Sequence, residues 1–114
     1  MTDPLHQPAV DELDLAAVLH ALSDPVRRQI VRDLSGAGPR HCGAFAVPVA
    51  KSTLSHHLKV LREAGVTFTE AAGTQRVVSL RTADLSARFP GLLDAVLAAA
   101  PAPAGEAAAA PAAA

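Results

Sequence analysis

The stretch from Lys51 to Gly65, which reads KSTLSHHLKVLREAG, decides the fold that we predict for this chain. Leu54, Leu58 and Leu61 recur in it at i, i+4 and i+7, a spacing that places all three on one side of an α-helix. The opposite side holds hydroxyl, imidazole and charged groups, namely Ser52, Ser55, His56, Lys59 and Glu63, with Arg62 at the flank. Hydroxyl and cationic groups contact DNA phosphates and base edges. The stretch therefore predicts a helix with one buried side and one side suited to a DNA groove.

Glycine, proline and capping residues divide the rest of the chain into short elements. In chain order, we predict an arm of weak order at 1–10, helices at 11–22 and 25–34, a short turn and loop at 41–50, hairpin strands at 66–70 and 75–80 with a tip at 71–74, a helix at 83–100 that Pro90 kinks or restarts, and a disordered tail at 101–114. Ser52 or Thr53 can cap the amphipathic helix, and Gly65 can end it in a left-handed conformation. This order is typical of a winged helix-turn-helix, so the predicted fold class is mainly α with a β-hairpin wing.

The 114 residues predict one domain, at 11–100, between a mobile N-terminal arm and an Ala/Pro-rich tail. Its effective core is small, which favours burial in an oligomer. No apolar run approaches the roughly 18 residues of a membrane span, and the N-terminus has no basic targeting region. We therefore expect a cytoplasmic protein with no membrane partner. A single cysteine, Cys42, excludes an internal disulfide.

The charge of the chain is unevenly distributed. The formal net charge is only −1, but residues 1–24 contain five acidic and no basic residues, whereas nine of the ten Lys and Arg residues lie within residues 25–81. Neutralising DNA phosphates requires only a local basic patch, so this distribution favours double-stranded DNA as the partner. Trp and Tyr are absent, which disfavours single-stranded nucleic acid read by stacked bases.

Two segments, ALSDPVRRQIVR at residues 21–32 and STLSHHLKVLREAG at residues 52–65, resemble the ArsR/SmtB family of bacterial winged-helix regulators. More loosely, the chain resembles the actinobacterial branch, with a shortened helix before the recognition helix. The resemblance implies a homodimer built on the first and last helices, an operator of two half-sites, and a ligand, often a metal ion, that alters DNA affinity. The chain departs from the family's familiar metal sites, because Cys42 has no Cys-x-Cys partner and the last helix offers Asp84 and Asp94 without a histidine.

The residues that we predict to contact DNA follow from the outer side of the amphipathic helix and from the hairpin. They are Ser52, Thr53, Ser55, His56, Lys59, Arg62 and Arg76. Arg62 either reaches a phosphate or is simply solvated. Arg76, beside the hairpin tip, either enters a minor groove or is a solvated strand charge, and Thr74 and Gln75 are weaker candidates for the same role. His57 lies at the edge of the apolar stripe, so we expect it to pack or hydrogen-bond rather than contact bases.

A transition-metal site is the predicted sensing element. His41 and Cys42 are adjacent, and thiolate plus imidazole suits nickel or zinc. His6 on the arm, Asp3 or the N-terminal amine would supply a further ligand of one ion per subunit, from the same chain or across the dimer. The alternatives are a structural Cys42 that packs as a small hydrophobe, and a redox-sensing thiolate whose pKa Arg40 and His41 would lower.

The function predicted from these patterns is a sequence-specific DNA-binding transcriptional regulator that responds to an effector. The alternative is a winged-helix module that works through a partner protein. An enzyme is disfavoured, because the chain has no glycine-rich phosphate loop and no arrangement of nucleophile and base that the hairpin architecture would bring together.

Overall fold

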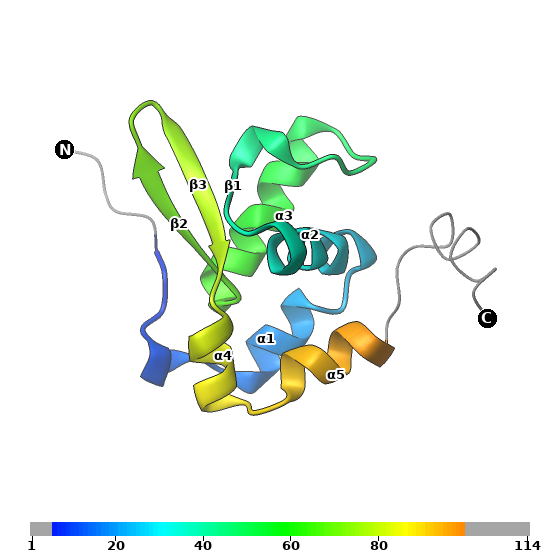
Figure 1. The fold of residues 1–114 in the computed structure, drawn as a ribbon, viewed down its shortest axis with the longest axis vertical. Helices are drawn as coiled ribbons and strands as arrows, with labels where there is room; N and C mark the ends of the chain where they lie inside the picture. The colour runs from blue at the N-terminus through cyan, green and yellow to red at the C-terminus, as the bar shows by residue number, and fades with distance from the viewer. Residues whose placement is uncertain (1–5, 100–114) are drawn as a thin grey trace.

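A computed structural model of the chain describes residues 6–99 (Figure 1). Its elements are η1 (Val10–Glu12), α1 (Leu15–Ala21), α2 (Pro25–Ala37), β1 (Arg40–His41), η2 (Cys42–Ala44), α3 (Lys51–Ala64), β2 (Thr67–Ala72), β3 (Gln75–Leu80), α4 (Thr82–Arg88) and α5 (Leu92–Ala99). The predicted fold class, mainly α with a β-hairpin wing, is confirmed. The predicted tail at 101–114 and the first five residues of the predicted arm lie outside the described residues.

The core lies where the helices meet the base of the hairpin. Its most deeply buried side chains come from α1, α2, α3, the segments flanking them, and β3; they are Leu13, Val18, Ile30, Val31, Leu61, Val66 and Val78. The β2–β3 hairpin projects from this core, away from α1, α4 and α5 (Figure 1). Within the described part of the chain, no helix is long and apolar enough to cross a membrane.

The first predicted helix begins four residues later than the sequence indicated. Residues 10–12 form one 3-10 turn, in which the Glu12 carboxylate accepts a hydrogen bond from the Ala9 backbone N–H at 2.8 Å. Asp14 then caps α1 by accepting from the Ala17 N–H at 3.0 Å. Leu13, between the two, is extended and buried against Gly65. Glu12 and Asp14, which were predicted to lie in the first turn of a helix, therefore act as caps on either side of the buried Leu13.

The second helix begins as predicted and ends later. Asp24 accepts hydrogen bonds from the backbone N–H groups of Val26 and Arg27, and Pro25 occupies the first helical position. The helix continues three residues beyond the predicted end at Leu34 and closes at Gly38, whose φ is 82°. Gly36 lies within the last turn of this helix and is exposed. A glycine at such a position weakens a helix but does not end it.

The wing is a three-stranded antiparallel sheet in the order β1-β3-β2. Ala72 pairs with Gln75, which leaves Gly73 and Thr74 as a two-residue turn, and the φ of 65° at Gly73 alone fits a type II′ turn. The hairpin is thus confirmed. The third strand, in which Arg40 pairs with Val78, was missed because the turn and loop predicted from His41 onwards include its second residue, and a two-residue strand carries no period.

The C-terminal helix is broken, as predicted, at Pro90. The segment splits into α4 and α5, and Gly91 takes a φ of 79° between them. Proline lacks the N–H that would continue α4, so a new helix starts after it. Ala100, the predicted end, lies outside the described residues.

The described part of the predicted N-terminal arm follows the outer edge of β2. Gln7 donates through Nε2 to the Thr69 carbonyl at 2.8 Å and accepts at Oε1 from the Thr69 N–H at 2.7 Å. The Pro8 carbonyl accepts from Arg81 Nη1 at 2.7 Å. In this way one side chain occupies the two backbone groups that an edge strand leaves unpaired.

Candidate nucleic-acid interface

Helix α3 has the two-sided character that the sequence predicted, with one change at its start. It begins at Lys51, with Ala50 as its N-cap and no side-chain cap. The prediction that Ser52 or Thr53 caps the helix is therefore wrong, and both hydroxyls are exposed. Gly65 ends the helix in the left-handed conformation, with φ 86° and ψ 12°, as predicted.

The side chains predicted to contact DNA lie on the open surface of α3 and the wing. Six of the seven are exposed and Arg62 is half-buried: Ser52, Thr53, Ser55, His56, Lys59, Arg62 and Arg76. None of their side chains hydrogen-bonds to another residue within 6–99. Their donors are therefore available to an external partner. Which of them touch DNA stays a prediction.

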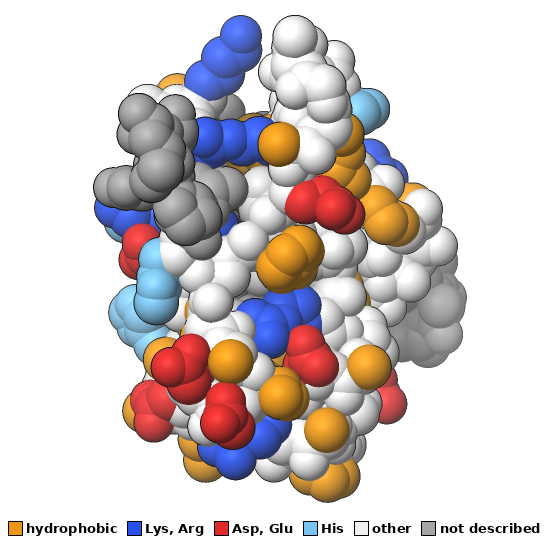
Figure 2. Space-filling view, turned by 90° about the vertical axis from the view of Figure 1, so that its left-hand side faces the viewer, with side chains coloured by type: hydrophobic (Ala, Val, Ile, Leu, Met, Phe, Trp, Pro, Cys, Tyr) orange, Lys and Arg blue, Asp and Glu red, His pale blue; other side chains and the backbone are white. Residues whose placement is uncertain are grey.

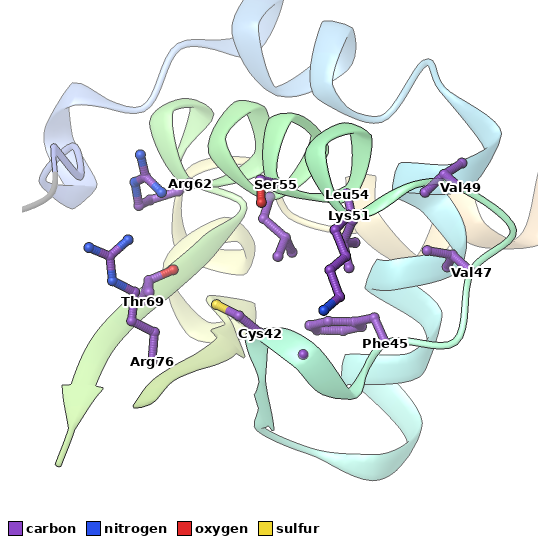
Figure 3. A pocket seen from close by; sticks show the side chains of 12 residues that line it. Cys42, Phe45, Val47, Val49, Lys51, Leu54, Ser55, Arg62, Thr69 and Arg76 are labelled. Carbon is purple, nitrogen blue, oxygen red and sulfur yellow. The ribbon is translucent and has the colours of Figure 1, made fainter. Parts of the chain in front are cut away.

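Arg76 faces α3 rather than the hairpin tip. It pairs with Ala71 on the hairpin, and it lines one cavity together with Ser55 and Arg62 of α3. Figure 3 shows Arg62 and Arg76 on the same side of this cavity. The wing and the recognition helix thus each contribute one guanidinium group to the same cavity, while Thr74 and Gln75 remain exposed near the tip.

Acidic groups do not neutralise this basic surface. The ion pair found among residues 6–99 joins Arg81 to Asp84 at 3.0 Å, on α4 and just before it. On the face drawn in Figure 2, Asp and Glu side chains gather mainly in the lower half, away from the hairpin tip. Cations without a carboxylate partner can approach phosphates without first breaking an internal ion pair.

A buried Arg27–His57 contact holds α3 in place. Arg27 Nη1 lies 3.1 Å from His57 Nδ1, and Arg27 also donates to the carbonyls of Ala21 at 2.7 Å and His20 at 3.3 Å. A guanidinium has no acceptor, so His57 Nδ1 accepts and its proton lies on Nε2. Burial lowers the pKa of His57, an effect that Asp24 partly opposes. The prediction that His57 packs or hydrogen-bonds is confirmed.

Arg27 lies on the buried side of α2. Only 7% of it is exposed, whereas Arg28 and Arg32 on the same helix are half-buried. The sequence contains a signal for this burial, because Arg27 shares the i, i+4 and i+7 positions with Val31 and Leu34, which are buried. A cation in an apolar stripe indicates a buried partner, and His57 and two helix-end carbonyls fill that role.

The three predicted metal ligands do not meet in one subunit. His41 and Cys42 line a cavity with Gln75 and Arg76, near the hairpin turn, whereas His6 lines another beside η1 and Glu63. No cluster of three His, Cys, Asp or Glu side chains suited to a metal ion occurs among residues 6–99. His41 and Cys42 alone offer two donors, fewer than the four of a typical zinc site.

The thiol of Cys42 is not activated in the way that was predicted. Burial raises its pKa above the ordinary value, an effect partly opposed by Arg76 and Arg62. The expectation that Arg40 and His41 lower this pKa is therefore wrong. A raised pKa keeps the group as the thiol, which is the less reactive form.

Comparisons with known proteins agree with this geometry. A family described as "Helix-turn-helix domain" matches residues 22–67. The uncharacterized HTH-type transcriptional regulator YceK of Bacillus subtilis (strain 168) is 37% identical over 87 residues, which are 74% of this chain and 87% of YceK. The HTH-type transcriptional regulator Rv2034 of Mycobacterium tuberculosis is 42% identical over 69 residues, which are 59% of this chain and 64% of Rv2034.

A solved structure extends the likeness to the whole winged fold. The crystal structure of an ArsR family transcriptional regulator superposes with a TM-score of 0.60 at 26% identity, covering 70% of this chain and 89% of that chain. These relatives are transcriptional regulators rather than enzymes. With its helix-turn-helix, its wing and an uncapped, cation-bearing α3, the chain belongs to the ArsR family of winged helix-turn-helix DNA-binding transcriptional regulators.

Proposed function

We propose that this regulator acts as a homodimer that reads an operator of two half-sites and releases it in response to an effector. The observation that carries the proposal is the exposed outer face of α3 together with Arg76, where neither Lys59 nor Arg76 pairs with a carboxylate among residues 6–99. Two such helices about 34 Å apart would enter successive major grooves on one side of the duplex. His56 and Lys59 lie one turn apart on that face, where an imidazole and an ammonium can contact a base edge and a phosphate.

Apolar surface on α1 supports the dimer. Leu15 and Leu19 are 47% and 44% exposed, one turn apart on the same side of that helix. Helix α5 is apolar on most sides, yet none of its residues is fully buried. Helices of this kind are normally covered. A second subunit packed on α1 and α5 would cover both.

The test of DNA binding starts with a duplex recovered by selection from a random library, followed by fluorescence anisotropy across a salt series. Lys59→Gln should weaken binding and reduce the slope of log K against log salt by about 1, because one phosphate contact is lost. Arg88→Gln is the control: it also replaces an exposed cation, but on α4, where the guanidinium donates to the Leu13 carbonyl at 2.8 Å, and it should leave the slope unchanged. Recovery of no duplex would favour the partner-protein module instead.

Metal response requires its own experiment, since His41, Cys42 and His6 do not converge in one subunit. Nickel or zinc binding would need ligands from outside residues 6–99 of that subunit. Calorimetric titration of the dimer with each metal, compared with Cys42→Ser, decides the matter. Equal affinity and stoichiometry in both proteins would reject Cys42 as a ligand.

A further inference from the structure

A cavity of about 480 Å³ opens on the DNA-reading side of the molecule (Figure 3). It lies between α3, the segment 42–49, and strands β2 and β3. Its volume is within the roughly 300–1,000 Å³ that small-molecule sites occupy. One part of its wall is apolar and is made by Phe45, Val47, Val49, Leu54 and Leu58.

The rest of the cavity carries positive charge. Lys51, Arg62 and Arg76 line it, and none of the three pairs with a carboxylate among the described residues. Figure 3 shows Arg62 and Arg76 on one side, with Phe45, Val47 and Val49 on the other. Arg62 Nε is buried without a hydrogen-bond partner within residues 6–99. A buried donor left unpaired is unfavourable, so an acceptor at this position would be stabilised.

We propose that this cavity binds a small amphipathic anion, with an apolar body against Phe45 and the neighbouring valines and a carboxylate-like head between Arg62 and Arg76. A bare phosphate would leave the apolar wall unused, and a neutral apolar molecule would leave the guanidinium groups unpaired. Guanidinium groups suit a planar, bidentate carboxylate in particular. The combination of surfaces therefore selects for a molecule with both properties.

Binding there would oppose DNA binding directly. This step rests on the proposed function, because it needs α3 and Arg76 to contact DNA. Ser55, Arg62 and Arg76 line the cavity and also belong to the predicted DNA surface. A carboxylate that occupies the two guanidinium groups removes them from the phosphates, and the two ligands then exclude each other. The effector response requires no change in the arrangement of the subunits.

The test uses sodium decanoate as the probe and 1-decanol as its neutral counterpart. Calorimetry without DNA should show decanoate binding and much weaker decanol binding. Arg62→Gln should weaken decanoate binding by roughly ten- to a hundredfold, the usual effect of losing a charge-assisted hydrogen bond. With the selected duplex, decanoate at ten times its own dissociation constant should raise the apparent Kd for DNA roughly tenfold, as simple competition requires.

Val47→Trp separates the cavity from the DNA surface. Val47 lines the cavity but is not among the predicted DNA contacts. A tryptophan at this position would fill the cavity, so it should abolish decanoate binding and leave the Kd for the duplex unchanged. If the variant does not fold, Val49→Gln makes the apolar wall polar and should also weaken decanoate binding. Equal binding of decanoate and decanol, or decanoate binding unaffected by these changes, would overturn the site.

The two proposals can fail separately. If decanoate binds in the cavity but leaves the Kd for the duplex unchanged, competition is overturned while DNA binding stands. If no duplex binds at all, the proposed DNA-reading function fails, and the calorimetric measurements still decide whether the cavity takes an amphipathic anion.

Discussion

The buried imidazole of His57 makes stability depend on pH. Burial lowers the pKa of His57 below the ordinary value of 6.5, so the unfolded chain binds this proton more readily than the folded one. The contribution is fully present above pH 6.5 and is lost as the pH falls towards the folded pKa. Burial is the main cause, and the contact with Arg27 adds to it, because protonation would place a second cation against a buried guanidinium.

We therefore expect the free energy of unfolding to fall as the pH drops below 6.5, with a slope from this group of at most about 1.4 kcal/mol per pH unit. His57→Asn should flatten that part of the profile, because its amide oxygen can still accept from Arg27 but does not titrate. Urea denaturation at a series of pH values provides the measurement, and His56→Ala, an exposed neighbour, is the control. A profile that His57→Asn leaves unchanged would contradict the assignment.

Gly65 is a position where only glycine fits. Its φ of 86° disfavours any L side chain, and a Cβ there would meet the Leu13 side chain and Pro8. Gly65→Ala should therefore lower the free energy of unfolding by about 2–4 kcal/mol, from backbone strain plus overpacking.

Gly36 is the matched control for that substitution. It lies in the last turn of α2 with open space around its Cα, so Gly36→Ala should raise stability by roughly 0.5–1 kcal/mol through helix propensity. Chemical denaturation of both variants gives the comparison. Equal changes in the free energy of unfolding for the two substitutions would show that neither the φ of Gly65 nor its contact with Leu13 matters for stability.

At the scale of elements, the sequence predicts those whose signals are local. The stripe of leucines gives α3 its buried side, and Gly73 between β-branched runs gives the hairpin. The start of α1 could not be predicted, because Asp11, Glu12 and Asp14 satisfy a helix N-terminus equally well at two positions four residues apart. Strand β1 could not be predicted either, since Arg40 and His41 are a strand only because Val78 and Val77 lie opposite them.

The predicted DNA-contact surface also combines features that the sequence predicts with features that only the fold creates. Exposure of Ser55, His56 and Lys59 follows from helical spacing alone, and it is confirmed. The cavity between α3 and the wing could not be predicted, because Phe45, Leu54 and Arg76 approach one another only through the fold. The proximity of Arg76 to Arg62 likewise depends on how the hairpin leans on α3.

The edge of the wing depends on one side chain from the N-terminal segment. Gln7 satisfies both backbone groups of Thr69, so Gln7→Ala should expose them to water and cost about 1–2 kcal/mol. Hydrogen exchange should show faster exchange of the Thr69 amide, with little change at Val78 on the central strand. Gln75→Ala, which lies at the hairpin turn, is the control. Unchanged protection at Thr69 would mean that Gln7 does not cover this edge.

At the scale of the whole molecule, the large apolar residues exposed among residues 6–99 lie in three places, one of which is Val10 on η1. Leu15 and Leu19 lie on α1, while Phe68, 40% exposed, lies on β2. If α1 and α5 form the dimer interface, a charge at Leu19 would be buried there without a partner, whereas the same charge at Phe68 would remain in water.

Leu19→Glu should therefore convert the protein to a monomer, as measured by analytical ultracentrifugation, and Phe68→Glu should remain a dimer. Leu19 is already 44% exposed within one subunit, so the folded monomer should tolerate the change. Circular dichroism can verify that the variant is folded. Because two half-sites bound by linked subunits gain affinity through effective concentration, the monomer should bind the selected duplex roughly 10²-fold or more weakly. A Leu19→Glu protein that stays dimeric would place the interface elsewhere, and a monomer with undiminished affinity would show that one recognition helix suffices.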